Sequence, residues 1–179
     1  LGTDTLYLYG MDELYDRIDT IYVENDKFSY TTSVDTITSA YLLLKNRIEY
    51  PVFLDKGNKI KIKGDTINLN FLTISGNIYN EEFTDFQKAL EDPADPSEKA
   101  GEETVDKRIT VEKANTAEEM AEEFILQHHS SYVSLYLLDK YFVQKETPDF
   151  SKIKKLVEVM TGVLQDKPYI ERLNETITQ

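Results

Sequence analysis

The spacing of apolar and polar residues changes once along this chain, near Gly76. Before Gly76, short runs alternate with a period of two and are separated by turn residues, which is typical of antiparallel strands. After Gly76, apolar residues recur every three or four positions, which is typical of helices. The pattern therefore predicts an α+β chain, with an antiparallel β half at residues 1–76 and a helical half at residues 77–179.

The β half holds about seven candidate strands, and their short, even spacing predicts an antiparallel β-sandwich or barrel-like sheet. The polar turn at residues 24–27 predicts a hairpin between the strands on either side of it. Pro51 cannot donate to a ladder, so its strand is expected at an edge or a bulge. The candidate strands are Thr5–Tyr9, Asp16–Val23, Phe28–Thr32, Ala40–Lys45, Ile48–Leu54, Lys59–Lys63 and Asn68–Ser75.

The helical half is predicted to form a bundle of about four to five helices. Asn77 and Asn80 are both candidate N-caps for the first helix. Residues 92–115 are acidic and poorly periodic, so we expect a loop or a loosely packed helix there. The motif at 116–119 is a capping box and predicts the start of the next helix. The next helix is expected over Tyr132–Val143, with Ser130 or Ser131 as its N-cap, and it should be the most buried. Two further helices are expected to start at Asp149 and at Pro168.

The apolar faces of the predicted helices are together large enough to cover one face of a sheet. We therefore expect the two halves to pack together as one module.

Composition and charge exclude several classes of function. The chain contains no Cys, so thiolate and disulfide chemistry within it is excluded. Its net charge is -13, and residues 91–123 hold 12 acidic residues against 4 basic ones. A nucleic-acid backbone requires clustered Lys and Arg, so no nucleic-acid partner is expected. No apolar run reaches the roughly 18 residues of a transmembrane helix. The chain does not begin with Met, and we expect it to start downstream of a removed segment.

Side chains able to carry catalysis do not gather in any recognisable motif, so no catalytic, cofactor-binding or metal-ligating residue is predicted. His128 and His129 are neighbours on a predicted helix and point about 100° apart, so they cannot share an ion as an i,i+4 pair would. The carboxylate pairs are expected to be solvated faces rather than glycosidase acids. They are Glu81-Glu82, Glu102-Glu103, Glu118-Glu119 and Glu122-Glu123. The sequon at Asn174 falls on a predicted helix and is attributed to chance.

Tyrosines are the one feature of the β half that suggests ligand contact. Exposed tyrosines on a sheet can stack against a sugar or a peptide, whereas half-buried strand tyrosines are the commoner outcome. Both interpretations stay open, and the ligand-binding residues are unknown. The tyrosines concerned are Tyr7, Tyr9, Tyr15, Tyr22, Tyr30, Tyr41 and Tyr50.

Three stretches resemble a known family: residues 53–65, 74–83 and 124–136. They are similar to the N-terminal domain of unknown function that precedes a thioredoxin-like domain in many cell-envelope thiol–disulfide oxidoreductases of Gram-negative anaerobes. That family has Asn-Pro-Asp-Ser before its buried helix, where this chain has His-His-Ser-Ser at 128–131. The following Tyr132-Val133-Ser134 agrees with the family.

The resemblance implies a periplasmic or lipid-anchored parent lipoprotein whose redox Cys-x-x-Cys lies on a thioredoxin-like domain, absent from this chain. No catalytic residue carries over, because the matched stretches hold none. The leading prediction is a non-catalytic accessory domain that positions the redox domain, binds a client or mediates homodimerisation, and it involves no cofactor. The alternative is a stand-alone glycan- or peptide-binding module that uses the sheet tyrosines. A hydrolase would require a polar pocket with a strongly perturbed titratable group.

Overall fold

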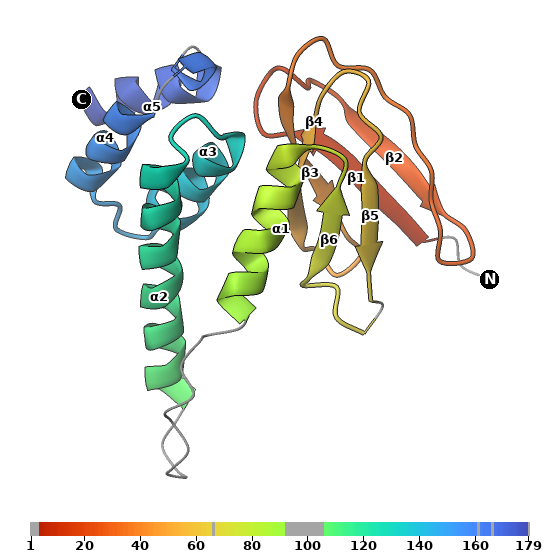
Figure 1. The fold of residues 1–179 in the computed structure, drawn as a ribbon, viewed down its shortest axis with the longest axis horizontal. Helices are drawn as coiled ribbons and strands as arrows, with labels where there is room; N and C mark the ends of the chain where they lie inside the picture. The colour runs from red at the N-terminus through yellow and green to blue at the C-terminus, as the bar shows by residue number, and fades with distance from the viewer. Residues whose placement is uncertain (1–3, 66, 92–105, 161, 166, 179) are drawn as a thin grey trace. The chain divides into compact units, whose positions relative to one another are not determined.

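The computed structural model describes residues 4–65, 67–91, 106–160, 162–165 and 167–178 (Figure 1). Its class is α+β, as predicted, with strands in the first part and helices in the second. The chain divides into two compact units, Leu1–Asp85 and Phe86–Gln179, which we call unit 1 and unit 2. None of the helices described is long and apolar enough to cross a membrane.

A four-stranded antiparallel sheet forms most of unit 1. It contains β1 (Asp4–Gly10), β2 (Ile18–Val23), β3 (Thr38–Leu43) and β4 (Glu49–Leu54), in the order β2-β1-β3-β4 (Figure 1). Every second residue of these strands points to the same face, and that face is apolar and buried. The register places Leu8 opposite Leu42 and Leu42 opposite Tyr50, so the three side chains form one row. The buried face comprises Leu6, Leu8, Ile21, Ala40, Leu42, Tyr50, Val52 and Leu54.

Two further strands, β5 (Lys61–Gly64) and β6 (Leu72–Ser75), pair with each other as a separate antiparallel ribbon. Tyr50 of the large sheet fastens this ribbon. Its hydroxyl donates to the Leu72 carbonyl at 2.9 Å and accepts from the Leu72 amide at 3.1 Å. Because a hydroxyl has one donor and two acceptor sites, one side chain satisfies both backbone groups of Leu72.

Helix α1 (Ile78–Glu91) attaches to both sheets through two side chains that lie one turn apart. Asn77 caps it, since the Asn77 side chain accepts from the Asn80 amide at 3.0 Å. Asn80 accepts from the Phe53 amide and donates to the Phe53 carbonyl, both at 2.9 Å. The Thr84 hydroxyl does the same for the Ile74 amide and carbonyl, both at 3.1 Å. Each side chain therefore takes the place of a neighbouring strand, at the outer edge of β4 and of β6 respectively.

The prediction of seven strands and a barrel-like sheet is not confirmed. Six strands occur in the residues described, and each overlaps a predicted one. The strand predicted at Phe28–Thr32 is wrong. The predicted turn forms and is closed by an isolated bridge between Glu24 and Lys27. Beyond it, residues 28–32 form no ladder. The Arg17 guanidinium instead holds this segment through the Thr32 hydroxyl at 2.5 Å and the Ser33 carbonyl at 3.0 Å. Pro51 does lie on an edge strand, because β4 ends the sheet.

Unit 2 is helical and contains the C-terminal end of α1. Its other helices are α2 (Asp106–Gln127), α3 (Tyr132–Leu138), α4 (Phe150–Val159) and α5 (Pro168–Thr178). A π-helical stretch (Asp139–Val143) extends α3, and a short 3₁₀ turn (Gly162–Leu164) precedes α5. Within this unit, Phe86 packs edge-on against Phe124 of α2, with ring centroids 5.7 Å apart.

Two of the predicted N-caps in this unit are confirmed. The Ser131 side chain accepts from the Val133 amide at 3.2 Å. The Asp149 side chain accepts from the Lys152 amide at 3.1 Å, and α5 begins at Pro168 as predicted.

Burial in unit 2 centres on α3, all of whose residues are buried. The sequence predicts the most buried helix over Tyr132–Val143, and this holds for α3 but not for the π-helical stretch after it, where Lys140 is exposed. Asp139, which follows α3, is buried as well and is engaged by neutral partners. Its carboxylate accepts from the Tyr169 hydroxyl and from the side-chain amide of Gln144, each at 2.5 Å. The π-helical register that begins at Asp139 thus coincides with a hydrogen-bonded side-chain cluster.

The capping box predicted at 116–119 is wrong, because α2 begins ten residues earlier at Asp106. The motif therefore lies inside the helix. Between Asp106 and Thr116 the sequence contains no Gly or Pro, and it is rich in Lys, Arg, Glu and Ala, which favour helix. Residues 106–115 are accordingly helical, whereas the expectation for 92–105 falls outside the described residues.

Candidate functional site

A groove of about 890 Å³ lies in unit 1 against the apolar face of the four-stranded sheet. Volumes of roughly 300–1,000 Å³ are typical of ligand sites. The floor is supplied by strands of the large sheet, one wall by the segment that follows β2, and the other wall by the segment that leads into and forms β5. Its lining residues include Leu8, Ile21, Leu42, Val52 and Leu54 of the floor, Asp26–Thr32 and Val34 of the first wall, and Lys59–Lys63 of the second.

The wall after β2 is held by a cluster of polar side chains around Asp19. The Asp19 carboxylate accepts from the Tyr15 hydroxyl and from Arg17 Nε at 3.2 Å. The Tyr15 hydroxyl also lies 3.0 Å from the Thr32 hydroxyl, and the Arg17 guanidinium lies over the Tyr15 ring at 4.5 Å. Tyr30 hydrogen-bonds to the same carboxylate. Because Tyr30 and Thr32 both line the groove, this cluster fixes the position of the wall.

The interactions within the cluster shift the pKa values of Tyr15, Asp19 and Tyr30 further away from neutral pH. Burial raises the pKa of Asp19, but hydrogen bonds from Tyr15, Tyr30 and Arg17 outweigh burial and leave the pKa below its usual range. Burial and hydrogen bonding to Asp19 raise the pKa values of Tyr15 and Tyr30. Around pH 7 the carboxylate is therefore ionised and the phenols are neutral. This arrangement organises a loop and does not supply a general acid or base poised near pH 7.

The second wall is fixed by the turn before β5 and by the start of α1. Asn77 donates to the Phe53 carbonyl at 2.8 Å and to the Asn58 side chain at 3.0 Å. Gly76 lies directly against this wall, since a Cβ placed on it would lie 2.3 Å from the Lys59 carbonyl oxygen. Its φ of 113° also falls where side chains are disfavoured. Glycine is therefore the residue type that this junction accommodates.

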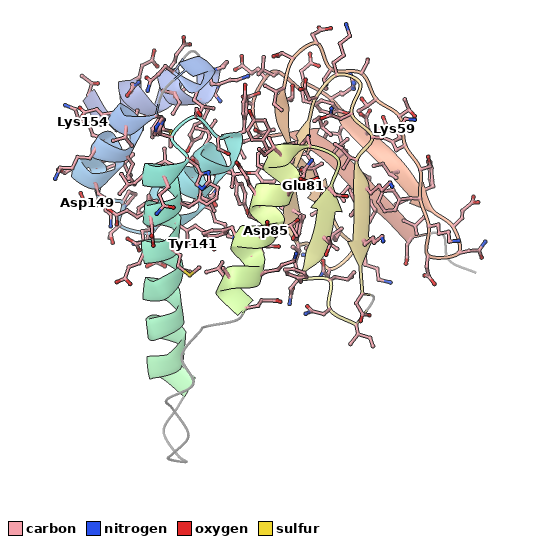
Figure 2. The ribbon with its side chains drawn as sticks, in the orientation of Figure 1. Lys59, Glu81, Asp85, Tyr141, Asp149 and Lys154 are labelled. Carbon is pink, nitrogen blue, oxygen red and sulfur yellow. The ribbon has the colours of Figure 1, made fainter. Side chains whose placement is uncertain are left out.

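Lysines give the second wall its charge. Lys59, Lys61 and Lys63 alternate with Ile60 and Ile62, and the lysines are exposed while the isoleucines are partly buried. Lys59 is labelled in Figure 2. Lys27 lines the opposite wall, and the acidic residues of the lining are Asp26 and Asp55. Among the residues described, none of the four lysines takes part in an ion pair. The groove is thus basic in a chain whose net charge is -13.

The tyrosines singled out in the sequence separate into three environments. Tyr50 and Tyr15 are buried and serve structure, and Tyr30 lines the groove. The other four lie on the opposite face of the four-stranded sheet, which we call the tyrosine face. Tyr9 and Tyr41 are directly opposed, with ring centroids 5.7 Å apart, and the Tyr9 hydroxyl donates to Glu49. Tyr7 and Tyr22 are 39% and 64% exposed there, beside Ile18 at 73%.

The remaining candidates are distributed over unit 2 without forming a cluster. His128 is half-buried and stacks on Phe124 at 4.2 Å, while its neighbour His129 is exposed. Two of the predicted solvated carboxylates make ion pairs with Lys152, at 3.6 Å for Glu118 and 2.7 Å for Glu122.

Other candidates give no sign of a site. Asn174 is exposed on α5, and Glu102-Glu103 lies outside the described residues. No group of three His, Asp or Glu residues placed to hold a metal ion occurs in the part of the chain that the structure describes.

Sequence reasoning missed both walls of the groove. The alternation of Lys59–Lys63 predicts a strand, but it does not indicate that the strand borders a groove. The sequence does not predict the contact of the Arg17–Asp19 pair with Thr32. This contact depends on the irregular course of residues 28–32, for which the alternation predicts a strand. An Arg and an Asp two residues apart, with Thr and Tyr some 13 residues later, are too common to identify such a cluster in advance.

The fold and the groove define an α+β chain whose strand unit holds a concave, basic surface. A family model described as "Domain of unknown function (DUF4369)" matches residues 1–83, which is nearly the whole of unit 1. The match supports an N-terminal domain of unknown function in this chain. No curated protein and no solved structure matches the chain significantly.

Proposed function

We propose that this chain is a non-catalytic accessory module of a cell-envelope thiol–disulfide oxidoreductase, and that unit 1 is its contact surface. The observation that carries the proposal is the groove, which combines an apolar floor with two walls. The hydrogen bonds of its polar cluster hold one wall in place and leave no group of that cluster tuned for chemistry near pH 7. A surface of this kind binds a partner and leaves the reaction to another domain.

The residues that carry the family resemblance support this proposal. Within the stretches 53–65 and 74–83 lie Phe53, Asn58, Gly76, Asn77 and Asn80. All five build the junction between β4, the second wall and α1. The resemblance therefore concerns residues that hold the groove together, as expected when the shared property is a scaffold rather than a reaction.

The reading frame around this segment tests the proposal directly. We expect a lipoprotein-type signal upstream and a thioredoxin-like domain with Cys-x-x-Cys downstream, in a protein exported to the periplasm or anchored in the envelope. Fractionation of cells that express the parent gene checks the location. A stop codon soon after Gln179 or a cytoplasmic product contradicts the proposal.

The tyrosine face favours a second candidate function, a stand-alone module that binds a glycan or peptide. Tyr7 and Tyr22 are exposed beside Ile18, and stacking of a sugar ring needs such flat aromatic surfaces. Titration of ¹⁵N-labelled protein with soluble oligosaccharides is the test. Chemical-shift changes confined to β1 and β2, and lost in Tyr22→Ala, support this candidate. If the wild type shows no shift changes, or if Tyr22→Ala shows the same changes as the wild type, this candidate is contradicted.

A further inference from the structure

The strand β5 has one edge without a neighbour among the residues described. The β5–β6 ribbon has two strands, so each strand has one outer edge. On β6 that edge is occupied, because the backbone groups of Leu72 and Ile74 bind Tyr50 and Thr84. Ile62 is directly opposite Ile74, and antiparallel ladders alternate the direction of their backbone groups. The amide and carbonyl of Ile62 therefore point away from β6.

The outer edge of β5 borders the groove. Ile60 and Ile62 line the groove together with the floor residues of the large sheet. No backbone hydrogen bond from the described residues reaches the outward groups of Ile62. Unpaired backbone groups in a row are a template for one more strand. The groove thus offers an added strand both hydrogen bonds along one side and an apolar surface beneath.

The charge of the groove and the alternation of side chains along a strand together specify which residue types an added strand would have. A strand paired with β5 places alternate side chains on the side of Ile60 and Ile62, against the apolar floor. The intervening side chains lie on the side of Lys59, Lys61 and Lys63, where opposite charges pair favourably across strands. Lys27 adds a further positive charge at the other wall, and Asp26 and Asp55 offset only part of this charge.

We propose that the groove of unit 1 binds an extended acidic peptide segment of a partner protein as a strand added to β5. The segment alternates apolar residues, which face the sheet, with Asp or Glu, which face the lysines. This is recognition by β-strand addition, in which main-chain hydrogen bonds give affinity and alternate side chains give specificity. The inference rests on the proposed function only in treating unit 1 as a binding surface.

A titration with synthetic peptides tests the proposal. The full chain, ¹⁵N-labelled, is mixed with an eight-residue capped peptide that alternates Val and Glu. Shifts are expected in residues 60–64 and 28–32, with the amide of Ile62 moving downfield as it gains a hydrogen bond. Two peptides serve as controls: one alternates Val and Lys, and one carries N-methyl groups along the edge that would face β5. Neither control is expected to bind.

Charge-reversal variants sharpen the test. Replacing Lys61 and Lys63 together by Glu is expected to weaken binding of the acidic peptide roughly tenfold and to permit binding of the Val-Lys peptide. Lys154→Glu, on the exposed face of α4 (Figure 2), is the matched control and is expected to leave the affinity unchanged. Raising the salt concentration is expected to weaken binding of the acidic peptide to the wild type.

Several results would overturn the proposal. They are no shifts with the acidic peptide, shifts centred on Tyr7 and Tyr9, equal binding of the N-methylated peptide, or an unchanged affinity of the Lys61 and Lys63 variant. These outcomes are distinguishable from failure of the proposed function. The reading frame decides whether the parent carries a thioredoxin-like domain, and the titration decides what the groove binds in either case.

Discussion

The two outer edges of the β5–β6 ribbon differ in whether their outward backbone groups have hydrogen-bond partners among the residues described. On β6, the Thr84 and Tyr50 hydroxyls each satisfy both backbone groups of one residue, Ile74 and Leu72 respectively. On β5, the outward backbone groups of Ile62 face the groove, with no backbone partner among the residues described. An edge of a sheet is a liability unless it is covered, so proteins usually protect it. This chain covers one edge and leaves the other beside an apolar, basic surface.

The outer edge of β4 follows the covered pattern. Its Phe53 amide and carbonyl are both bound by Asn80, and Pro51, which has no amide to offer, lies on the same strand. Side chains from α1 and from the large sheet therefore close the edges around the junction. The contrast with these covered edges is the reason why we propose that the open edge of β5 binds a partner. The predictions that follow test the covered edges first, from the largest expected effect to the smallest.

Removal of the Asn80 side chain is expected to have the largest effect. Asn80→Ala leaves the amide of buried Phe53 without a partner, removes one of the two donors to the Phe53 carbonyl, since Asn77 still donates there, and empties the buried space of the side chain. We expect a loss of about 3.5 kcal/mol in the free energy of unfolding from these effects together. Chemical denaturation measures the change. Asn174→Ala, at an exposed position of α5, is the control and is expected to change stability by no more than about 0.5 kcal/mol. A comparable loss in both variants contradicts the role given to Asn80.

Gly76 and Gly57 form a matched pair of positive-φ glycines. Gly76→Ala combines a strained φ with a clash against the Lys59 carbonyl, and we expect a loss of about 3 kcal/mol. Gly57 has a φ of 78° and nothing within 4 Å of the position that a Cβ would take, so Gly57→Ala should show the backbone strain alone, about 1 kcal/mol. Thermal or urea unfolding of both variants checks the difference. Equal losses would show that the second wall does not lie against Gly76.

Thr84→Val tests the hydroxyl at the covered edge of β6 with little change in shape. The variant leaves the Ile74 amide and carbonyl unpaired, and we expect a loss of about 2 kcal/mol in the free energy of unfolding. Thr84→Ser keeps the hydroxyl and should lose less than half as much. If Val is tolerated as well as Ser, the edge of β6 does not depend on this side chain.

The Asp19 cluster gives the smallest effect, and it depends on pH. Because the folded-state pKa of Asp19 lies below its unfolded value, its stabilisation is present above the unfolded pKa and is lost as the pH falls through the folded pKa. The wild type should therefore lose stability on acidification below about pH 4, where the unfolded carboxyl titrates. In Asp19→Asn that part of the pH dependence should be absent, as unfolding midpoints across the acidic range would reveal. An unchanged acid profile argues against the cluster.

Sequence reasoning predicted the class of the fold and most of its elements for identifiable reasons. Period-two alternation fixes which residues of a strand face the core, and the buried face of Leu6, Leu8, Leu42 and Val52 follows that period. Local caps such as Ser131 and Asp149 were predictable because capping involves neighbours in sequence. The capping box at 116–119 failed for the same reason, since a local motif cannot report that a helix has already begun upstream.

The site could not be predicted, because its defining interactions are long-range and carried by single side chains. Asn77 and Asn80 are both candidate N-caps; Asn77 caps α1, whereas Asn80 pairs with Phe53, 27 positions earlier. The segment 28–32 has the alternation of a strand, and its side chains are instead drawn to Arg17 and Asp19. Nothing in a local window distinguishes an Asn that caps a helix from one that replaces a strand.

Amide hydrogen exchange of the free protein tests the contrast between covered and open edges most directly. We expect the amides of Phe53, Leu72 and Ile74, bound by side chains at the covered edges, to exchange on the order of a hundredfold more slowly than the amide of Ile62. We also expect the acidic peptide to slow exchange at Ile62 alone among these four residues. An Ile62 amide as protected as that of Ile74 in the free protein would contradict this contrast, because the edge of β5 would then already be occupied.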